Sequence, residues 1–269
     1  RMDLSDGAQV NQEEWDQFLD FVGKTHIRGA VRVLSKLPST PRCKACGGPF
    51  GGFGGRLMKA IGRGPSRKNP YWCSACFEHS PEGGFVGTVG VVFADVRGST
   101  ALGESLPPDE VAALMSEFFD RATKVIVQHG FIDKLIGDEV MGVYIPSLAR
   151  DGRIVDALVG DARKILQSVG YGSADGPLLD VGIGIDLGSA YLGHVGTETA
   201  TDFTVIGDVV NTAARLQGQA RPGQIVMREE LALRAGLGDD EGDRVALTLK
   251  GKADTVPARI LTTTTPAIS

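Results

Sequence analysis

The spacing of hydrophobic positions changes twice along the chain and divides it into three parts. Residues 11–37 carry apolar side chains at helical spacing until "KLPSTP" ends the pattern, so we expect an N-terminal helix or helix pair within residues 1–40. Residues 41–80 are rich in glycine and have no such period. From Phe85 onward, short apolar runs alternate with helical patterns, and residues 84–265 form the predicted main domain.

The main domain is predicted to be an α+β sandwich. We expect strands near 87–94, 131–136, 139–145, 178–187, 190–195, 224–227 and 257–262, a further strand near 244–249, and helices near 107–129, 151–169 and 208–219. The order strand–helix–strand–strand–helix–strand is that of a ferredoxin-like fold. Gly137-Asp138 is a turn signal, which predicts a tight hairpin between the second and third strands.

Composition places the chain among globular proteins. Of its 269 residues, 42% are hydrophobic and 23% are charged, and the formal net charge is −5. This mild acidity argues against nonspecific binding of nucleic acid by the whole chain. No uncharged apolar run approaches the roughly 18 residues that span a bilayer, and no signal-peptide pattern opens the sequence. We therefore expect a cytoplasmic protein without a membrane partner.

The four cysteines predict a metal site. They form two pairs within residues 41–80, Cys43-x2-Cys46 and Cys73-x2-Cys76, and four thiolates at such spacing bind Zn²⁺ tetrahedrally. A metal would supply the folding energy that this glycine-rich stretch lacks. An iron–sulfur cluster uses the same ligands and a module without metal stays open, whereas disulfides are disfavoured in a reducing cytosol.

The cysteine stretch is also strongly basic. It contains no acidic residue from 41 to 77, and its cations would offset the negative charge of a four-thiolate zinc site. A docking surface for nucleic acid, an acidic partner or a nucleotide is the sharper interpretation, but no aromatic side chains interleave with the basic residues in the stacking pattern that favours nucleic acid. We expect a structural or regulatory module. The basic residues are Arg42, Lys44, Arg56, Lys59, Arg63, Arg67 and Lys68.

Two aspartates stand where predicted strands end. The apolar run "VGVVFADVRGST" reaches Asp95, and Asp138 lies in the predicted hairpin. If these strands are neighbours, both carboxylates lie at one edge of the sheet, and a cation between them would relieve their repulsion. Mg²⁺ takes protein carboxylates together with substrate phosphates. Taken alone, Asp138 is better interpreted as a turn residue, and Asp95 alone favours a metal site no more than a structural role.

Four blocks in order, "FADVRGST", "HGFIDKLIGDEVMGVY", "VGIGIDLGSAYLGHVG" and "DFTVIGDVVNTAARLQGQARPGQIVM", resemble the class III nucleotidyl cyclase catalytic domain. The resemblance covers about residues 85–262. It implies conversion of a nucleoside triphosphate to a 3′,5′-cyclic monophosphate and pyrophosphate. It also implies a head-to-tail homodimer with two symmetric sites, each built from both chains.

The resemblance assigns Asp95 and Asp138 as ligands of two Mg²⁺ or Mn²⁺ ions per site. In the two-metal scheme, one ion lowers the pKa of the attacking ribose hydroxyl and the other holds the phosphates. The loop after Asp95 offers backbone amides for the triphosphate, with one position free of a side chain. The candidate phosphate-binding residues of this loop are Val96, Arg97, Gly98, Ser99 and Thr100.

By the same resemblance, Lys134 and Thr204 read the base, Asn211 orients the ribose and Arg215 stabilises the transition state. Lys134 can donate to adenine N1 and the Thr204 hydroxyl can accept from N6, so ATP is the expected substrate. Because a hydroxyl both donates and accepts, GTP or a pyrimidine triphosphate stays open. Asn211 and Arg215 are four residues apart, which places them on one face of a helix.

The resemblance leaves open which residues contact the phosphates. Either Lys250 or Lys252 in "LKGK" matches a lysine that lies near the phosphates in the family. Ser189 stands where some relatives carry an arginine, a loss that Arg97 or the lysine could cover.

The alternative class of function is a nucleotide-sensing module that has lost catalysis. Degenerate copies lose an aspartate, the asparagine or the arginine, and all six principal residues are present here. A third interpretation makes the cysteine module the functional end, binding DNA in a salt-dependent way.

Overall fold

The computed structural model describes residues 10–24, 43, 48–67, 70, 72–78, 81, 83–146, 149, 152–197, 200–252 and 254–263. Cys46 and positions 25–37 of the expected N-terminal helical segment lie outside these residues. The chain divides into two compact units, one formed by Arg1–Gly87 with Ala190–Ile206 and the other by Thr88–Ser189 with Gly207–Ser269. Among the described residues, no helix has the length and apolarity needed to cross a bilayer.

The first unit joins the N-terminal elements to a β-hairpin. Its helices are α1 (Gln12–Lys24), α3 (Gly52–Ala60) and α4 (Ser74–Glu78), and its hairpin consists of the end of β4 (Val181–Thr197) and β5 (Ala200–Ile206), paired antiparallel. The start of β1 (Gly84–Val96) belongs to this unit, where Val10 bridges Gly84 and the Asn11 amide donates to the Gly84 carbonyl at 2.8 Å. Elements far apart in sequence therefore share one packed unit.

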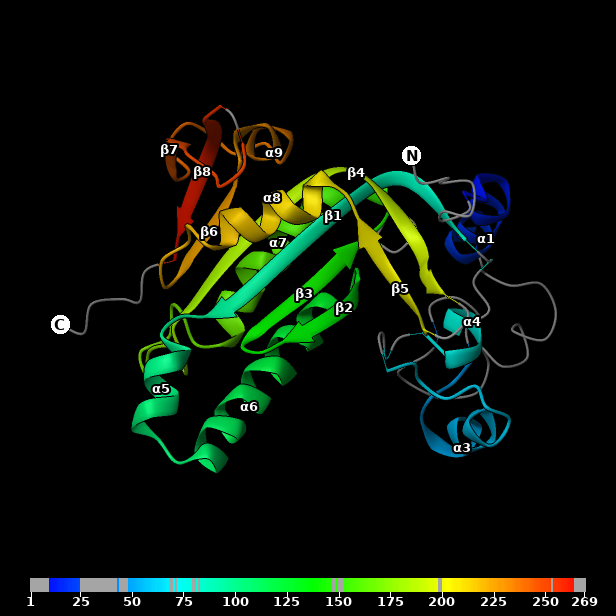
Figure 1. Cartoon of the computed structure of the whole chain (residues 1–269). Coiled ribbons are helices and arrows are strands. Elements are labelled where there is room, and N and C mark those ends of the chain that lie inside the picture. Colours follow the sequence, from blue (N-terminus) through cyan, green and yellow to red (C-terminus); the bar gives the residue numbers. More distant parts are fainter. Residues whose placement is uncertain are drawn as a thin grey trace. The chain divides into compact units, whose positions relative to one another are not determined.

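The second unit carries most of an α+β sheet. The order along the sheet is β2-β3-β1-β4-β6-β8-β7, with β5 pairing on β4 (Figure 1). The strands are β2 (Phe131–Ile136), β3 (Glu139–Tyr144), β6 (Gln224–Arg228), β7 (Asp243–Leu247) and β8 (Val256–Thr262). The helices are α5 (Ser99–Ser105), α6 (Pro108–Ile126), α7 (Ile154–Ser168), α8 (Asp208–Gln217) and α9 (Glu229–Arg234).

Helix α6 shows how sequence determines packing. Pro108 lies in its first turn, followed by Asp109 and Glu110, which favour the positive end of the helix dipole. Its buried residues Phe118, Ala122 and Ile126 repeat every four positions, and the helix packs on β2, β3 and α7. The core of this unit lies between such helix faces and the apolar central strands.

The fold confirms the expected α+β class, and several elements differ from the expected boundaries. The two strands predicted near 178–187 and 190–195 are one strand, β4, because neither Gly188 nor Ser189 interrupts its extended backbone. Strand β5 and the short helices α3, α4, α5 and α9 were not predicted. Short helices contain too few residues for a helical period to be recognised in the sequence.

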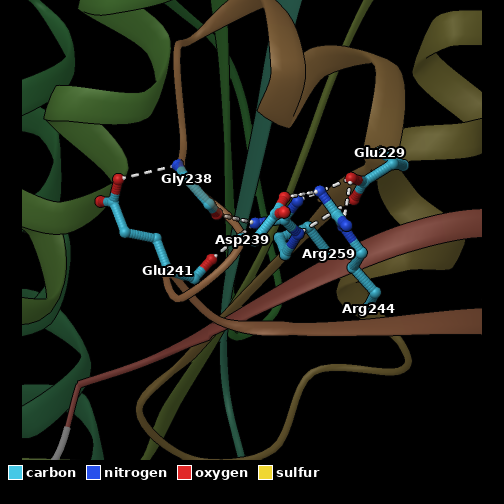
Figure 2. Close-up of polar contacts among 6 residues, drawn as sticks. All are labelled: Glu229, Gly238, Asp239, Glu241, Arg244 and Arg259. Carbon is cyan, nitrogen blue, oxygen red and sulfur yellow. Dashed lines mark hydrogen bonds and ion pairs between the residues drawn. The ribbon is translucent and has the colours of Figure 1, made fainter.

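An ion-pair network around the buried Arg259 supports the C-terminal hairpin of β7 and β8 (Figure 2). The Arg259 side chain is fully buried and donates to both carboxylate oxygens of Glu229, at 2.9 and 2.6 Å. Its third nitrogen donates to the carbonyls of Gly238 and Glu241, at 2.7 and 2.8 Å. Arg244 reaches the same Glu229 carboxylate at 2.9 Å. The bidentate pairing satisfies a buried guanidinium that would otherwise be costly.

Candidate active site

Two acidic strand ends meet at one edge of the second unit's sheet. Strands β1 and β3 pair antiparallel with Asp95 directly opposite Glu139, and the Val96 amide donates to the Asp138 carbonyl at 3.2 Å. Gly137 supplies the left-handed turn residue, with φ 60°, in the hairpin between β2 and β3. The sequence prediction that Asp95 and Asp138 share a sheet edge is therefore confirmed.

Their proximity perturbs the carboxyl groups. Burial raises the pKa of Asp95, the Arg97 guanidinium opposes this rise, and the charge of Asp138 adds to it. Burial also raises the pKa of Glu139 to about 7, with further contributions from Asp95 and Asp138. The three carboxyl groups thus form a site of excess negative charge that a cation would relieve.

Arg97 lies beside this site. Its guanidinium lies 3.1 Å from the Asp95 carboxylate and donates to the Gln217 carbonyl at the end of α8. Gly182 on β4 leaves the space for it, since a Cβ there would lie 2.5 Å from Arg97 Nε. In this arrangement Arg97 neutralises an acid within its own chain.

The loop after Asp95 retains only part of the expected phosphate cradle. The amides of Val96 and Arg97 donate to the carbonyls of Asp138 and Asp180, so they are already used within the protein. Gly98, with φ 73°, is the N-cap of α5, and Ser99 and Thr100 begin the helix, where backbone amides have no intrahelical acceptor. We therefore narrow the candidate amides to Gly98, Ser99 and Thr100.

The Ser99 side chain contacts the acidic edge. Its hydroxyl donates a short hydrogen bond to Asp138 Oδ2. Ser99, which lies in the loop after Asp95, thus fixes the orientation of the Asp138 carboxylate. The sequence indicated Ser99 only through its backbone.

Helix α8 carries Asn211 and Arg215, four residues apart as expected, with Asn211 exposed and Arg215 half-buried. The helix lies very close to β4 at Gly184, where a Cβ would stand 2.1 Å from the Gln217 nitrogen. A Cβ on Gly251 would lie 3.3 Å from Arg215 Nη2, so the "LKGK" turn passes beside the Arg215 guanidinium. The structure thus brings Arg215 together with the segment that holds both candidate lysines.

The two lysines of that turn differ in their surroundings. Lys252 Nζ lies 2.7 and 2.6 Å from the two carboxylate oxygens of Asp208, and this bond lowers the pKa of Asp208. Lys252 also lines a cavity of about 420 Å³ together with Thr212 and Arg228. Lys250 is exposed. Lys250 is therefore better placed than Lys252 to reach a ligand outside the chain.

The candidate base-reading residues belong to different units. Lys134 follows a β-bulge in β2, is exposed, and has its Nζ 4.0 Å from the buried Asp133 carboxylate. Thr204 lies in β5 opposite Gly193, with 8% of its surface exposed. Ser189, where some relatives carry an arginine, lies in β4.

Three of the four cysteines gather in the first unit. The sulfur atoms of Cys43, Cys73 and Cys76 all lie within 4.8 Å of one another. The Cys73 amide donates to the Cys43 sulfur at 3.2 Å, and the Cys76 amide donates to the Cys73 sulfur at 3.3 Å. Clustered thiols with amide donors to sulfur match the donor set of a zinc site.

Both implied metal sites fit the residues present. The acidic edge offers carboxylate oxygens, the donors that Mg²⁺ and Mn²⁺ prefer. The cysteine cluster offers sulfur donors at close spacing.

Glu139 is the acidic residue that sequence reasoning missed, because its place at the acidic edge depends on lying directly across the strand pair from Asp95. The adjacent acids in "GDEV" were the available signal.

Comparison with known proteins agrees with this arrangement. Residues 84–256 match the family model described as "Adenylate and Guanylate cyclase catalytic domain". An adenylate cyclase of Anabaena cylindrica is 34% identical over 132 residues, which are 48% of this chain and 26% of that protein. An uncharacterized protein of Mycobacterium tuberculosis is 33% identical over 162 residues, 55% of this chain and 27% of that protein. The chain thus spans about a quarter of the length of these relatives.

Solved structures share the fold. The guanylyl cyclase Cya2 matches with a TM-score of 0.58 and 24% identity, over 70% of this chain and 98% of that one. The adenylyl cyclase CyaB from P. aeruginosa matches with a TM-score of 0.56 and 23% identity, over 69% and 99%. The match over residues 84–256 shows that the chain belongs to the adenylate and guanylate cyclase catalytic domain family, and the sheet topology and the paired acidic strand ends agree with this assignment.

Proposed function

We propose that this chain is an adenylate cyclase that converts ATP to 3′,5′-cyclic AMP and pyrophosphate in a cytoplasmic homodimer with two shared sites. The observation that carries the proposal is the meeting of Asp95 and Asp138 at one sheet edge, where burial and mutual repulsion raise the pKa of Asp95. Carboxylates arranged in this way favour a bound divalent cation over two separate ion pairs.

The acidic edge would hold the metal ions. Asp95 and Asp138 are the proposed ligands of Mg²⁺ or Mn²⁺, which when bound lowers the pKa of the ribose 3′-hydroxyl and supports the phosphates. Ser99 keeps the Asp138 carboxylate in a fixed orientation through its hydroxyl. The amides of Gly98, Ser99 and Thr100 are the proposed donors to the triphosphate.

The remaining residues act on the reacting nucleotide. The 3′-oxygen attacks the α-phosphorus as the bond from that phosphorus to the bridging oxygen of pyrophosphate breaks, and the hydroxyl proton leaves to water. Asn211 orients the ribose, and the permanently charged Arg215 stabilises the oxygens on which charge develops. Lys250, exposed and beside the Arg215 segment, is the proposed phosphate contact.

Base selection rests on Lys134 and Thr204. We assign Lys134 as donor to adenine N1 and the Thr204 hydroxyl as acceptor from N6. The Anabaena relative is named an adenylate cyclase, whereas Cya2 is named a guanylyl cyclase. GTP is therefore the competing substrate in any test of this assignment.

The cysteines are proposed to hold a structural Zn²⁺. Cys43, Cys73 and Cys76 would supply three thiolates, and Cys46 is the proposed fourth ligand. Such a site would stabilise the local structure and would not act in catalysis, because four protein ligands leave no open position for substrate. A reducing cytoplasm keeps these thiols available.

Mixed dimers test the shared site. Asp95→Ala and Arg215→Ala chains should each be inactive as homodimers. Co-expressed with different affinity tags and purified as the mixed dimer, they should regain activity, because one of the two sites then has both an intact Asp95 and an intact Arg215.

The matched control combines Asp95→Ala with Asp138→Ala chains. Their mixed dimer should stay inactive, because both substitutions affect the same half of a shared site. A mixed Asp95→Ala and Arg215→Ala dimer with no more activity than this control would contradict the shared-site arrangement.

A further inference from the structure

The ring of Phe203 lies at the centre of an aromatic cluster in the first unit. It stacks on Trp15 with centroids 5.7 Å apart and an interplanar angle of 24°. It meets Phe77 edge-on at 5.5 Å and His194 at 5.2 Å. Each separation lies in the range where aromatic pairs attract beyond simple burial. One side chain of β5 thus contacts α1, α4 and β4.

The cluster is continuous with the cysteine cluster. Trp72 directly precedes Cys73 and Phe77 directly follows Cys76, and the two rings lie 6.1 Å apart. The same short segment supplies the two amides that donate to cysteine sulfur. The arrangement of the thiols and the position of Phe77, one of the rings that contact Phe203, are therefore set together.

The cluster is also continuous with the candidate base-reading residue. Thr204 follows Phe203, and successive side chains of a strand point to opposite faces. Phe203 and its cross-strand neighbour His194 thus share one face of the hairpin, and Thr204 lies on the other. Among the described strands, β5 pairs with β4 alone. In addition to this pairing, the ring contacts of Phe203 with α1 and α4 restrain β5.

We infer that Phe203 is a positioning residue that couples the metal-loaded cysteine cluster to base selection by Thr204. This inference rests on the proposed function, because it takes Thr204 as the residue that reads the base. The cysteine segment holds Phe77 against one side of the Phe203 ring, and α1 holds Trp15 against another. Held by these contacts, the Phe203 ring fixes the position of β5, so the Thr204 hydroxyl stays oriented toward the base. Loss of the metal or of the ring loosens β5.

Substitutions test the positioning role. Phe203→Ala should raise KM for ATP by about two- to tenfold, the range of one neutral hydrogen bond, with a smaller change in kcat and reduced preference for ATP over GTP. Phe203→Tyr keeps the ring and should therefore have the wild-type KM, kcat and preference for ATP over GTP. Phe18→Ala is the matched control: its ring contacts Trp15 and Trp72, and no described ring contact joins it to Phe203.

The outcome for Phe18→Ala separates positioning from stability. Both alanine variants remove a ring from the same cluster, so both should lose stability in urea. If the two variants change KM and base preference equally, or if neither changes them, the positioning role of Phe203 is overturned.

A second measurement tests the coupling to metal. The chain has two tryptophans, Trp15 and Trp72, and both lie in the cluster, so fluorescence excited selectively at tryptophan and not at tyrosine reports on this part of the protein. The full chain is stripped of tightly bound metal with a chelator and dialysed into Mg²⁺. Removal should shift tryptophan emission to longer wavelength and raise KM for ATP by the same two- to tenfold.

In Phe203→Ala, stripping should still shift the emission but should raise KM no further, because the link from the metal to Thr204 is already broken. Independent, multiplicative effects on KM would overturn the coupling, as would an emission shift without any change in KM of the wild-type chain. Failure of the proposed function looks different, since the untreated wild-type chain would then form no cyclic nucleotide from any triphosphate. In that case, the dissociation constant of a fluorescent ATP analogue replaces KM, and the same comparisons decide the positioning role.

Discussion

The close approach of α8 to β4 at Gly184 leads to a prediction that joins packing to catalysis. Gly184 pairs with Val226 in the sheet, and a Cβ on it would lie 2.1 Å from the Gln217 nitrogen and 2.4 Å from the Ala213 carbonyl oxygen. Both are backbone atoms of α8 and cannot swing aside as a side-chain tip would. Gly184→Ala therefore requires α8 to retreat from the sheet by about 1 Å.

The retreat should affect both stability and rate. Overpacking of this kind costs about 1–3 kcal/mol of unfolding free energy. Because α8 carries Asn211 and Arg215, a displacement of about 1 Å should also lower kcat by about 10²-fold. The assay is the initial rate of cyclic nucleotide formation at a temperature where urea titration shows the variant to be fully folded.

Gly160→Ala in α7 is the matched control. A Cβ there meets no atom within 4 Å, so the change should stabilise the helix by roughly 0.5–1 kcal/mol and leave kcat unaltered. A folded Gly184→Ala chain that turns over at the wild-type rate would show that the position of α8 does not control catalysis.

Three further predictions concern other parts of the chain. Glu229→Gln should lower the unfolding free energy by about 2–3 kcal/mol in urea titration, because it leaves the buried Arg259 guanidinium without its carboxylate, and an unchanged midpoint would contradict the network's role. Lys250→Ala should raise KM for the nucleotide more than Lys252→Ala does, and the reverse order in steady-state kinetics would reassign the phosphate contact. Elemental analysis of the purified chain should find zinc that is lost in Cys73→Ser, whereas iron with visible absorption would indicate a cluster instead.

Much of the second unit could be predicted from sequence because its elements are long and strongly patterned. The apolar run before Asp95 and the Gly137 turn signal determine which residues reach the acidic edge, and the structure has both where they were expected. Glu139 was missed, because only the cross-strand register shows that it faces Asp95. The engagement of the Arg97 amide by the Asp180 carbonyl was also beyond sequence reasoning, since these residues meet only in the fold.

The first unit was harder to predict because the aromatic contacts that join its elements link residues far apart in the sequence. The apolar spacing around Trp15 correctly indicated a helix, but no periodicity connects that helix with Phe203 or with Phe77. Strand β5 has the β-branched and aromatic residues of a strand, yet it is one short segment, and the sequence pattern of its partner β4 predicts two strands in place of one.

A turnover assay on the purified chain tests directly whether this protein is an adenylate cyclase. ATP, GTP, CTP and UTP are supplied separately with Mg²⁺ or Mn²⁺, and the products are resolved by mass. We expect cyclic AMP and pyrophosphate from ATP at a rate well above that of the other three nucleotides. Another cyclic nucleotide in larger amount would contradict the assignment of Lys134 and Thr204. A folded dimer that binds ATP and yields no cyclic product from any of the four would contradict the proposed enzymatic function itself.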